Sequence, residues 1–196
     1  QMGRKEEMFQ YAREKLTPYI SERANLLRKD CAAYLEMKRE YHRIVSDLLQ
    51  TAQKRQAAGT LGQIHYFSIF YLQSSAVTQS YDFALSLTNE RYCLDQNGLL
   101  CFWCPQRLFQ AVEEDLSFFE KDARQMWIRI RPYELEEIRR AYINNLYQLA
   151  GFFFGEESLD AAVLGGIVRL DCCDEVRFSF GGYMDQTIQF ALFRKG

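Results

Sequence analysis

The chain has few of the residues that interrupt or crosslink a protein: its 196 residues include three Pro, eleven Gly and two His. With 48% hydrophobic residues, this composition excludes collagen-like and disordered proteins and predicts a globular fold. No segment approaches the roughly 18 apolar residues of a membrane span, and the first residues are charged rather than signal-like. Six Cys are too few for a disulfide scaffold at this length. We therefore expect a cytoplasmic protein without a membrane segment.

Sequence motifs of catalysis are also missing. No G-x-S-x-G, P-loop, G-x-G-x-x-G or H-E-x-x-H pattern occurs. His42 and His65 are the only histidines, and neither adjoins a recognisable nucleophile motif, so an ordinary structural role is expected for each. These absences favour a non-enzymatic protein without a cofactor.

Charge is nearly balanced overall but divided along the chain. Residues 1–58 carry 12 Lys or Arg and 8 Asp or Glu, a net +4, whereas residues 59–196 carry 12 and 18, a net −6. A formal net charge of −2 argues against a protein built to bind nucleic acid, which needs clustered cationic surface. The mixed signs in the basic part are typical of a solvated helix face.

Residues 1–58 are predicted to be helical. Thr17 and Pro18 form a restart signal, with Thr17 as N-cap and Pro18 at the first helical position. From Pro18 to Gln56 there is no Gly or Pro, which predicts one helix of about 39 residues and roughly 60 Å. A compact chain of this length is only about 40 Å across, so the helix would overhang its own domain. Two interpretations remain: packing on the core, or self-association as a homo-oligomer through the overhanging end.

The remaining chain, 59–196, is predicted to be an α+β domain sharing one core. Its strands should form an antiparallel sheet of about five or six strands, with the C-terminal pair joining the first meander. Helices should cover the sheet. The expected strands are 64–72, 81–88, 91–94, 99–103, 176–180 and 188–192, a further short alternating segment is 127–131, and the expected helices are 105–123, 132–155 and 158–164.

A C-x-x-C motif is the sharpest local signal. A dithiol is redox active when the attacking Cys lies at a helix N-terminus, but Pro105 biases Cys104 toward extended backbone and opposes that arrangement. Structural thiols are therefore favoured. A metal site at Cys101 and Cys104 with Cys93 is a weaker alternative, because a second pair of ligands at matching spacing is missing.

Three arginines precede the predicted helix that begins at Pro132. Together with free backbone N–H groups at its start they could hold an anion such as phosphate, although nearby glutamates offer internal partners. These residues are Arg124, Arg129 and Arg131.

Aromatic residues make up 15% of the chain, and five of them fall in adjoining predicted strands. Tyr and Trp combine an apolar body with a polar tip, so a sheet face rich in them can line a pocket for a flat or cationic organic molecule. Core packing is the alternative. The five residues are Tyr66, Tyr71, Tyr81, Tyr92 and Trp103.

The leading hypothesis is a non-enzymatic binding module that recognises a protein partner or a small aromatic or cationic ligand on this sheet face. The alternative is a thiol- or metal-dependent protein centred on Cys101 and Cys104. Nucleic acid and membranes are not expected partners.

Overall fold

The computed structural model describes residues 3–194, apart from the side chain of Ala76. The chain forms two compact units, each built from two separate stretches of sequence. The first unit comprises 1–35 and 106–150, and the second comprises 36–105 and 151–196. The predicted division at residue 58 does not coincide with these boundaries. Within the described part, no helix has the length and apolar content needed to cross a bilayer.

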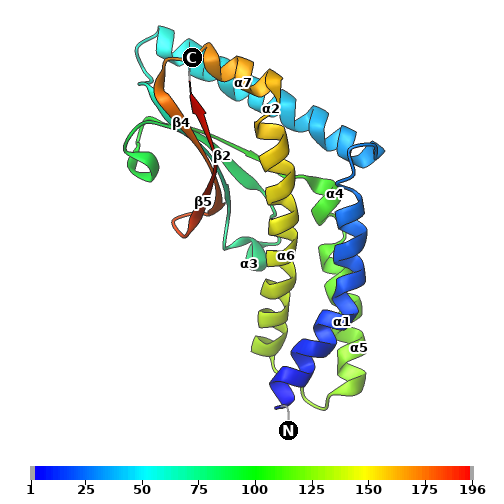
Figure 1. The fold of residues 1–196 in the computed structure, drawn as a ribbon. Coiled ribbons are helices and arrows are strands. Elements are labelled where there is room, and N and C mark those ends of the chain that lie inside the picture. Colours follow the sequence, from blue (N-terminus) through cyan, green and yellow to red (C-terminus); the bar gives the residue numbers. More distant parts are fainter. Residues whose placement is uncertain (1–2, 195–196) are drawn as a thin grey trace. The chain divides into compact units, whose positions relative to one another are not determined.

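The first unit is helical (Figure 1). Its helices are α1 (Arg4–Asn25), α4 (Gln106–Phe109), α5 (Val112–Met126) and the first part of α6 (Pro132–Ser158). A buried polar group fixes them together: the Arg23 guanidinium of α1 pairs with the Asp115 carboxylate of α5. Tyr142 of α6 donates to the same carboxylate over 2.6 Å. Buried apolar side chains recur at helical spacing along the same helices: Met8, Ala12, Leu16, Leu116, Phe119, Ala123, Ile138 and Leu146.

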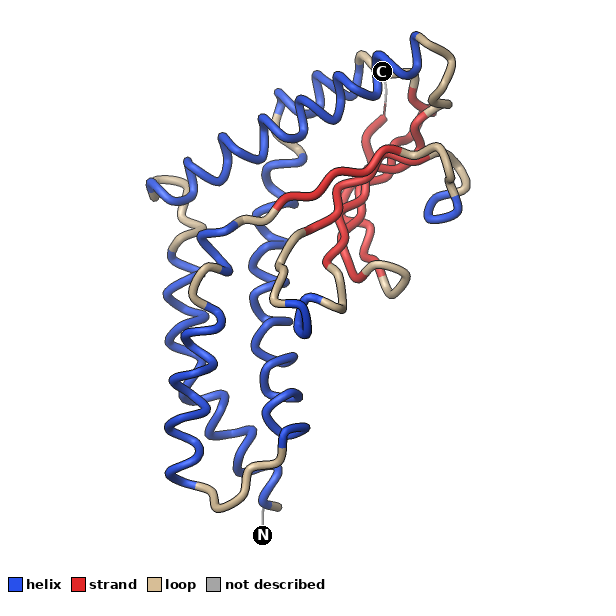
Figure 2. Tube along the Cα trace, turned by 180° about the vertical axis from the view of Figure 1, so that it is seen from behind, coloured by secondary structure: helices blue, strands red, loops and turns tan. Residues whose placement is uncertain are grey.

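The second unit contains a single five-stranded sheet, red in Figure 2, so the α+β class and the joining of the C-terminal strands are confirmed. The spatial order is β3-β2-β1-β4-β5. All neighbouring pairs are antiparallel except β1 and β4, which run parallel. The sequence pattern predicted an antiparallel sheet and missed this parallel pairing. A parallel pair needs a long crossover, and residues 72–171 provide one between β1 and β4. The strands are β1 (Ile64–Tyr71), β2 (Phe83–Thr88), β3 (Leu99–Trp103), β4 (Cys172–Gly182) and β5 (Thr187–Arg194).

Helices of this unit pack on one face of the sheet, called here the core face. They are α2 (Ala32–Ala57), the last turns of α6 and α7 (Ala161–Val168). Tyr41 of α2 is fully buried against Trp103 and Phe154, with ring centroids 5.5 and 5.4 Å away. Phe154 also meets Phe83 at 4.9 Å. These contacts explain much of the aromatic content as core packing.

The predicted 39-residue helix is wrong, since two helices stand in its place. Helix α1 continues through Pro18, and Thr17 Oγ1 donates to the Arg13 carbonyl instead of capping a new helix. The break falls at 26–31, where i to i+3 turns such as Leu26 N–H to Arg23 O replace helical bonds. Helices of 22 and 26 residues are about 33 and 39 Å long, so neither overhangs a compact domain. The argument for self-association through an overhanging end loses its basis.

Other boundaries also differ from the prediction. Residues 92–94 form a 3-10 helix and 127–131 form a loop, so neither is a strand. The helix predicted over 105–123 is split into α4 and α5. Gly155 does not end α6, because residues 151–158 are held on the core face by buried aromatic side chains. Helix α7 begins after Asp160, whose carboxylate accepts from the Ala162 N–H over 2.9 Å.

Candidate functional site

The second face of the sheet, called here the outer face, carries the candidate site. Register places Tyr66, Ser68 and Phe70 of β1 on this face, opposite Thr88, Ser86 and Ala84 of β2. Leu100 and Phe102 of β3 extend the same face and are 53% and 54% exposed. All six residues of β2 are nevertheless buried.

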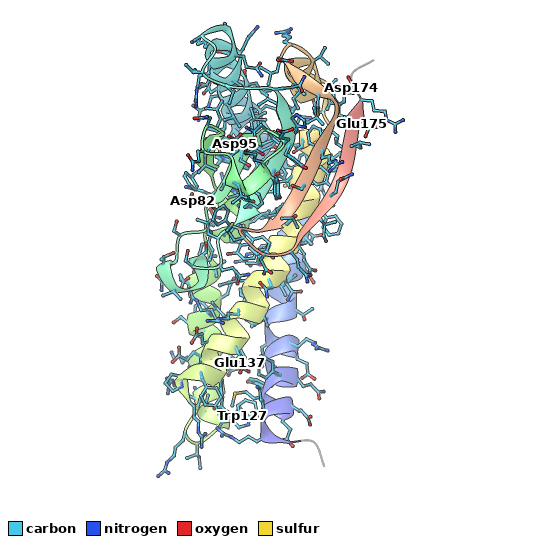
Figure 3. The ribbon with its side chains drawn as sticks, turned by 90° about the vertical axis from the view of Figure 1, so that its left-hand side faces the viewer. Asp82, Asp95, Trp127, Glu137, Asp174 and Glu175 are labelled. Atoms are coloured by element: carbon cyan, nitrogen blue, oxygen red, sulfur yellow. The ribbon has the colours of Figure 1, made fainter. Side chains whose placement is uncertain are left out.

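The connection between β2 and β3 folds over the outer face and is organised by Asp95, labelled in Figure 3. One carboxylate oxygen accepts from the Asn89 N–H and the other from the Asn97 N–H, each over 2.9 Å. The connection carries Tyr92, which adopts a left-handed backbone conformation with φ of 53°. Such a conformation costs an aromatic residue about 1–3 kcal/mol and persists only where surrounding contacts hold it.

Contacts of the Tyr92 ring provide that support. Its centroid lies 4.7 Å from Tyr66 and 6.1 Å from Phe70. Its hydroxyl donates to Thr187 Oγ1 and lies at the same 3.4 Å from Ser179 Oγ. The loop after β4 adds Tyr183, whose ring meets Phe70 edge-on at 5.6 Å. Four aromatic rings from three chain segments therefore meet on the outer face of the sheet.

A hollow of about 180 Å³ lies among these groups. Its walls include Phe70, Tyr92 and Tyr183, with Thr88 and Asp95 as polar groups. Thr88 is 8% exposed, and its Oγ1 is the one buried side-chain oxygen or nitrogen in the described structure that has no hydrogen-bond partner. Leaving a buried hydroxyl unpaired costs about 1–3 kcal/mol, so this oxygen is an acceptor that the fold leaves unused beside the hollow.

Of the five predicted aromatic residues, only Tyr66 and Tyr92 come together on the outer face. Tyr71 lies on the core face beside Phe180, and Trp103 packs there against Tyr41. Tyr81 is buried just before β2. The odd spacing between Tyr66 and Tyr71 already requires opposite faces of one strand, so a single pocket lined by all five is wrong.

Thr88, Asp95, Phe70 and Tyr183 were missed by sequence reasoning. The available signal was a set of hydroxyl residues at alternating positions in otherwise apolar strands, Ser68 in β1 with Ser86 and Thr88 in β2. A buried polar side chain in such a strand needs a partner, which draws attention to the face it lies on.

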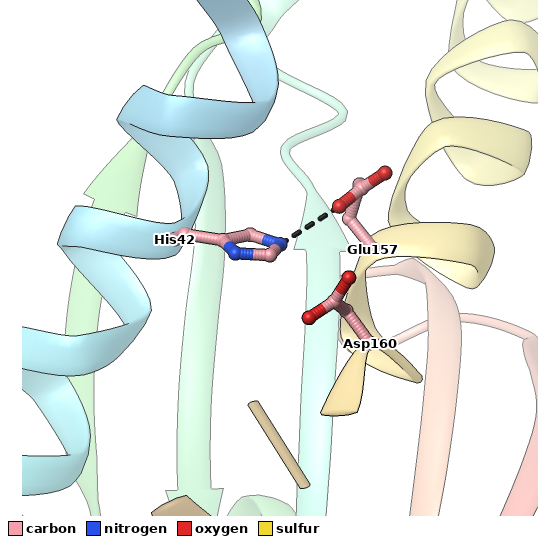
Figure 4. A group of neighbouring side chains, drawn as sticks. All are labelled: His42, Glu157 and Asp160. Carbon is pink, nitrogen blue, oxygen red and sulfur yellow. Dashed lines mark hydrogen bonds and ion pairs between the residues drawn. The ribbon is translucent and has the colours of Figure 1, made fainter. Parts of the chain in front are cut away.

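A second cluster joins α2 to the end of α6 and the start of α7 (Figure 4). His42 Nε2 lies 2.7 Å from Glu157 Oε2, and potential ligand atoms of His42, Glu157 and Asp160 lie within 4.8 Å of one another. Lys38 Nζ, however, contacts Asp160 at 3.0 Å and Glu157 at 3.2 Å. Its ammonium group thus takes the position of a cation between the two carboxylates, and a metal ion would have to displace it.

The ion pair between Lys38 and Asp160 shifts the pKa of both side chains. Hydrogen bonding to Asp160 raises the pKa of Lys38, and the Ala162 N–H together with Lys38 lowers the pKa of Asp160. Both shifts favour the charged forms. The cluster is consistent with a structural joint between α2 and α7.

The C-x-x-C cysteines are free and half-buried. Burial raises the pKa of Cys101 to about 11 and, with the Asp82 charge, that of Cys104 to about 12. Burial also raises the pKa of Cys93. Protonated thiols are poor nucleophiles and poor metal ligands. Within residues 3–194 these three cysteines do not form a cluster with metal-ligand spacing.

The three arginines near the start of α6 have internal contacts. Arg124 donates twice to Glu120, and the Arg129 carbonyl accepts from Arg4. The backbone N–H of Arg131 donates to Glu134 over 2.8 Å. A carboxylate of the protein itself therefore caps the helix start where an anion was predicted.

Comparison of the chain with known protein families, with curated proteins and with solved structures found no match.

Proposed function

We propose that this protein is a non-enzymatic binding module whose outer sheet face holds a small molecule with one aromatic ring. The observation that carries the proposal is the unpaired Oγ1 of Thr88, buried beside a hollow with aromatic walls. A purely structural face would be expected to pair this oxygen or replace it with a methyl group. The leftover acceptor gives a ligand one specific polar contact within an apolar surrounding.

The size of the hollow supports a ligand with a single ring. Its volume is about 180 Å³, and an apolar cavity of about 150 Å³ is enough to bind benzene. Phe70, Tyr92 and Tyr183 meet edge-on or tilted, an arrangement that can admit a further ring. Burying one ring gives about 2–3 kcal/mol and one hydrogen bond about 1 kcal/mol. With additional contacts from the loops, we expect dissociation constants of about 0.1–10 mM for simple probes.

Two other functions have less support. A protein partner on the exposed apolar side chains Leu100 and Phe102 would not account for the buried acceptor. A thiol- or metal-dependent function at Cys101 and Cys104 is disfavoured by the raised pKa of both thiols.

Phenol and toluene test the proposal because they share a ring and differ in one donor group. Amide NMR spectra recorded during titration should show saturable shifts for residues 68–70, 86–100 and 181–184, with phenol binding about five- to tenfold more tightly. In Thr88→Val this preference should disappear, whereas Phe102→Ala, on the same face but outside the hollow, should retain it. Absence of saturable shifts with phenol at concentrations up to about ten times the weakest expected dissociation constant would show that the proposal is wrong.

A further inference from the structure

The charged group in the lining of the hollow on the outer face is negative. Asp95 is the acidic residue among those lining it, and no Lys, Arg or His of the described chain belongs to that lining. The carboxylate oxygens of Asp95 each accept one backbone N–H, and an oxygen of this kind can accept a further bond. Thr88 Oγ1 adds an acceptor without a partner. The hollow therefore offers acceptors and negative charge to a ligand.

Gly98 brings the two acceptor residues close together. A Cβ atom placed on Gly98 would lie 2.9 Å from Thr88 Cγ2 and 3.3 Å from Asp95 Oδ2, so both side chains border the same glycine. Both residues also line the hollow. A single donor group with several hydrogens, such as an ammonium bound in the hollow, can therefore lie near both residues.

The aromatic side chains around the hollow also favour a positively charged ligand. The face of an aromatic ring is negative and attracts cations. An internal contact on the outer face illustrates this: the Arg177 guanidinium lies over the Tyr66 ring, with its carbon 5.8 Å from the centroid. Tyr66 in turn contacts Tyr92, which lines the hollow.

From this arrangement we infer that the ligand is an arylalkyl ammonium cation. Its ring packs among Phe70, Tyr92 and Tyr183, and its ammonium group donates to Thr88 Oγ1 and pairs with the Asp95 carboxylate. This inference rests on the proposed function and adds the charge and chemical class of the ligand. A carboxylate-bearing ligand of the same size would meet Asp95 with like charge and no cation among the residues that line the hollow.

Three probes with the same ring and two-carbon chain test the charge preference: phenethylamine, 2-phenylethanol and phenylacetate. We expect phenethylamine to bind the wild-type protein at least tenfold more tightly than 2-phenylethanol, and phenylacetate to bind most weakly, as measured by amide NMR titration. Salt should weaken the binding of phenethylamine but leave that of 2-phenylethanol nearly unchanged. These comparisons need no variant, so they hold even if a substitution disturbs folding.

Variants then assign the effect to one carboxylate. Asp95→Asn should reduce the preference for phenethylamine over 2-phenylethanol to less than threefold. Asp174→Asn removes the same charge from an exposed position outside the hollow and should leave the preference intact. A fold check by amide spectra accompanies both variants.

The outcomes separate the two proposals. If none of the three probes binds in the hollow, the proposed function fails and the inference fails with it. If 2-phenylethanol binds as tightly as phenethylamine, or phenylacetate binds more tightly than either, the ammonium assignment is overturned while the binding module stands. The same holds if Asp174→Asn lowers the preference as much as Asp95→Asn.

Discussion

Replacing Thr88 by Val should stabilise the protein, although most buried substitutions do the opposite. Val has nearly the shape of Thr, with a methyl group where Oγ1 lies. The change removes a buried oxygen without a partner, whose cost is about 1–3 kcal/mol, and it buries one methyl group worth up to about 0.8 kcal/mol. Allowing for loss of hydrogen bonding in the unfolded state, we expect a gain of about 1–2 kcal/mol in the free energy of unfolding.

The two Trp residues allow the gain in stability to be assigned to the second structural unit, which contains Thr88. Trp103 belongs to the second unit and Trp127 to the first. In a Trp127→Phe background, fluorescence reports unfolding around Trp103 alone. With a urea m-value of about 2–3 kcal/mol/M, Thr88→Val should raise the midpoint by about 0.5 M. In a Trp103→Phe background, the Trp127 transition should show a smaller shift or none, because Thr88 lies outside its unit.

A matched control is Ser179→Ala on the same face. Ser179 is also buried, but its hydroxyl donates to Ser68 Oγ over 2.8 Å. Its loss should lower stability by about 1 kcal/mol. If Thr88→Val lowers the midpoint as Ser179→Ala does, the Thr88 hydroxyl has a partner in the folded protein, and the reasoning that identifies it as a free acceptor is refuted.

Three further results are expected. Arg23→Met should lower the stability of the first unit by about 3–5 kcal/mol, because the buried Asp115 carboxylate loses its cation; a urea midpoint within error of wild type would contradict this. Gly98→Ala should cost the second unit about 1–3 kcal/mol in the same assay, since its Cβ would lie 3.1 Å from a backbone oxygen, and an unchanged midpoint would show that the backbone yields freely. At pH 8, Cys101 and Cys104 should react with iodoacetamide at least about a hundredfold more slowly than in the urea-unfolded chain, as followed by mass spectrometry, because burial raises both pKa values. Since the unfolded thiols ionise first, the same shifts predict that stability falls as pH rises from about 8.5 toward 11 or 12, and equal alkylation rates would refute both statements.

Much of the sheet was predictable because strand patterns are local. Short apolar segments between turn signals predicted β1, β2 and β3 in order, and the two C-terminal strands were recognised although β4 is longer than predicted. The helix break at 26–31 was not predictable in this way. Its residues carry no Gly or Pro, and the Pro that is present, Pro18, lies inside α1. At both places the observed backbone departs from what local propensity predicts.

The candidate site was only partly predictable. The aromatic composition pointed to the sheet, and Tyr66 and Tyr92 do meet on its outer face. The contact of Tyr92 with Tyr66 depends on the loop between β2 and β3. Asp95 holds this loop by hydrogen bonds to the backbone of residues 89 and 97. The free acceptor of Thr88 depends on what surrounds it in space. An absent partner leaves no pattern along the sequence.

The parallel pairing of β1 with β4 has a consequence for synthesis of the chain. Roughly 100 residues separate the end of β1 from the start of β4, which a ribosome adds in about 5–20 s at 5–20 residues per second. During that interval β1 can pair with β2 but has a second edge without a neighbour. Its sequence, Ile64–Tyr71, is rich in aromatic and β-branched residues, the composition of strands that pair with other chains. The interval before β4 emerges is therefore when a nascent chain is most exposed to aggregation.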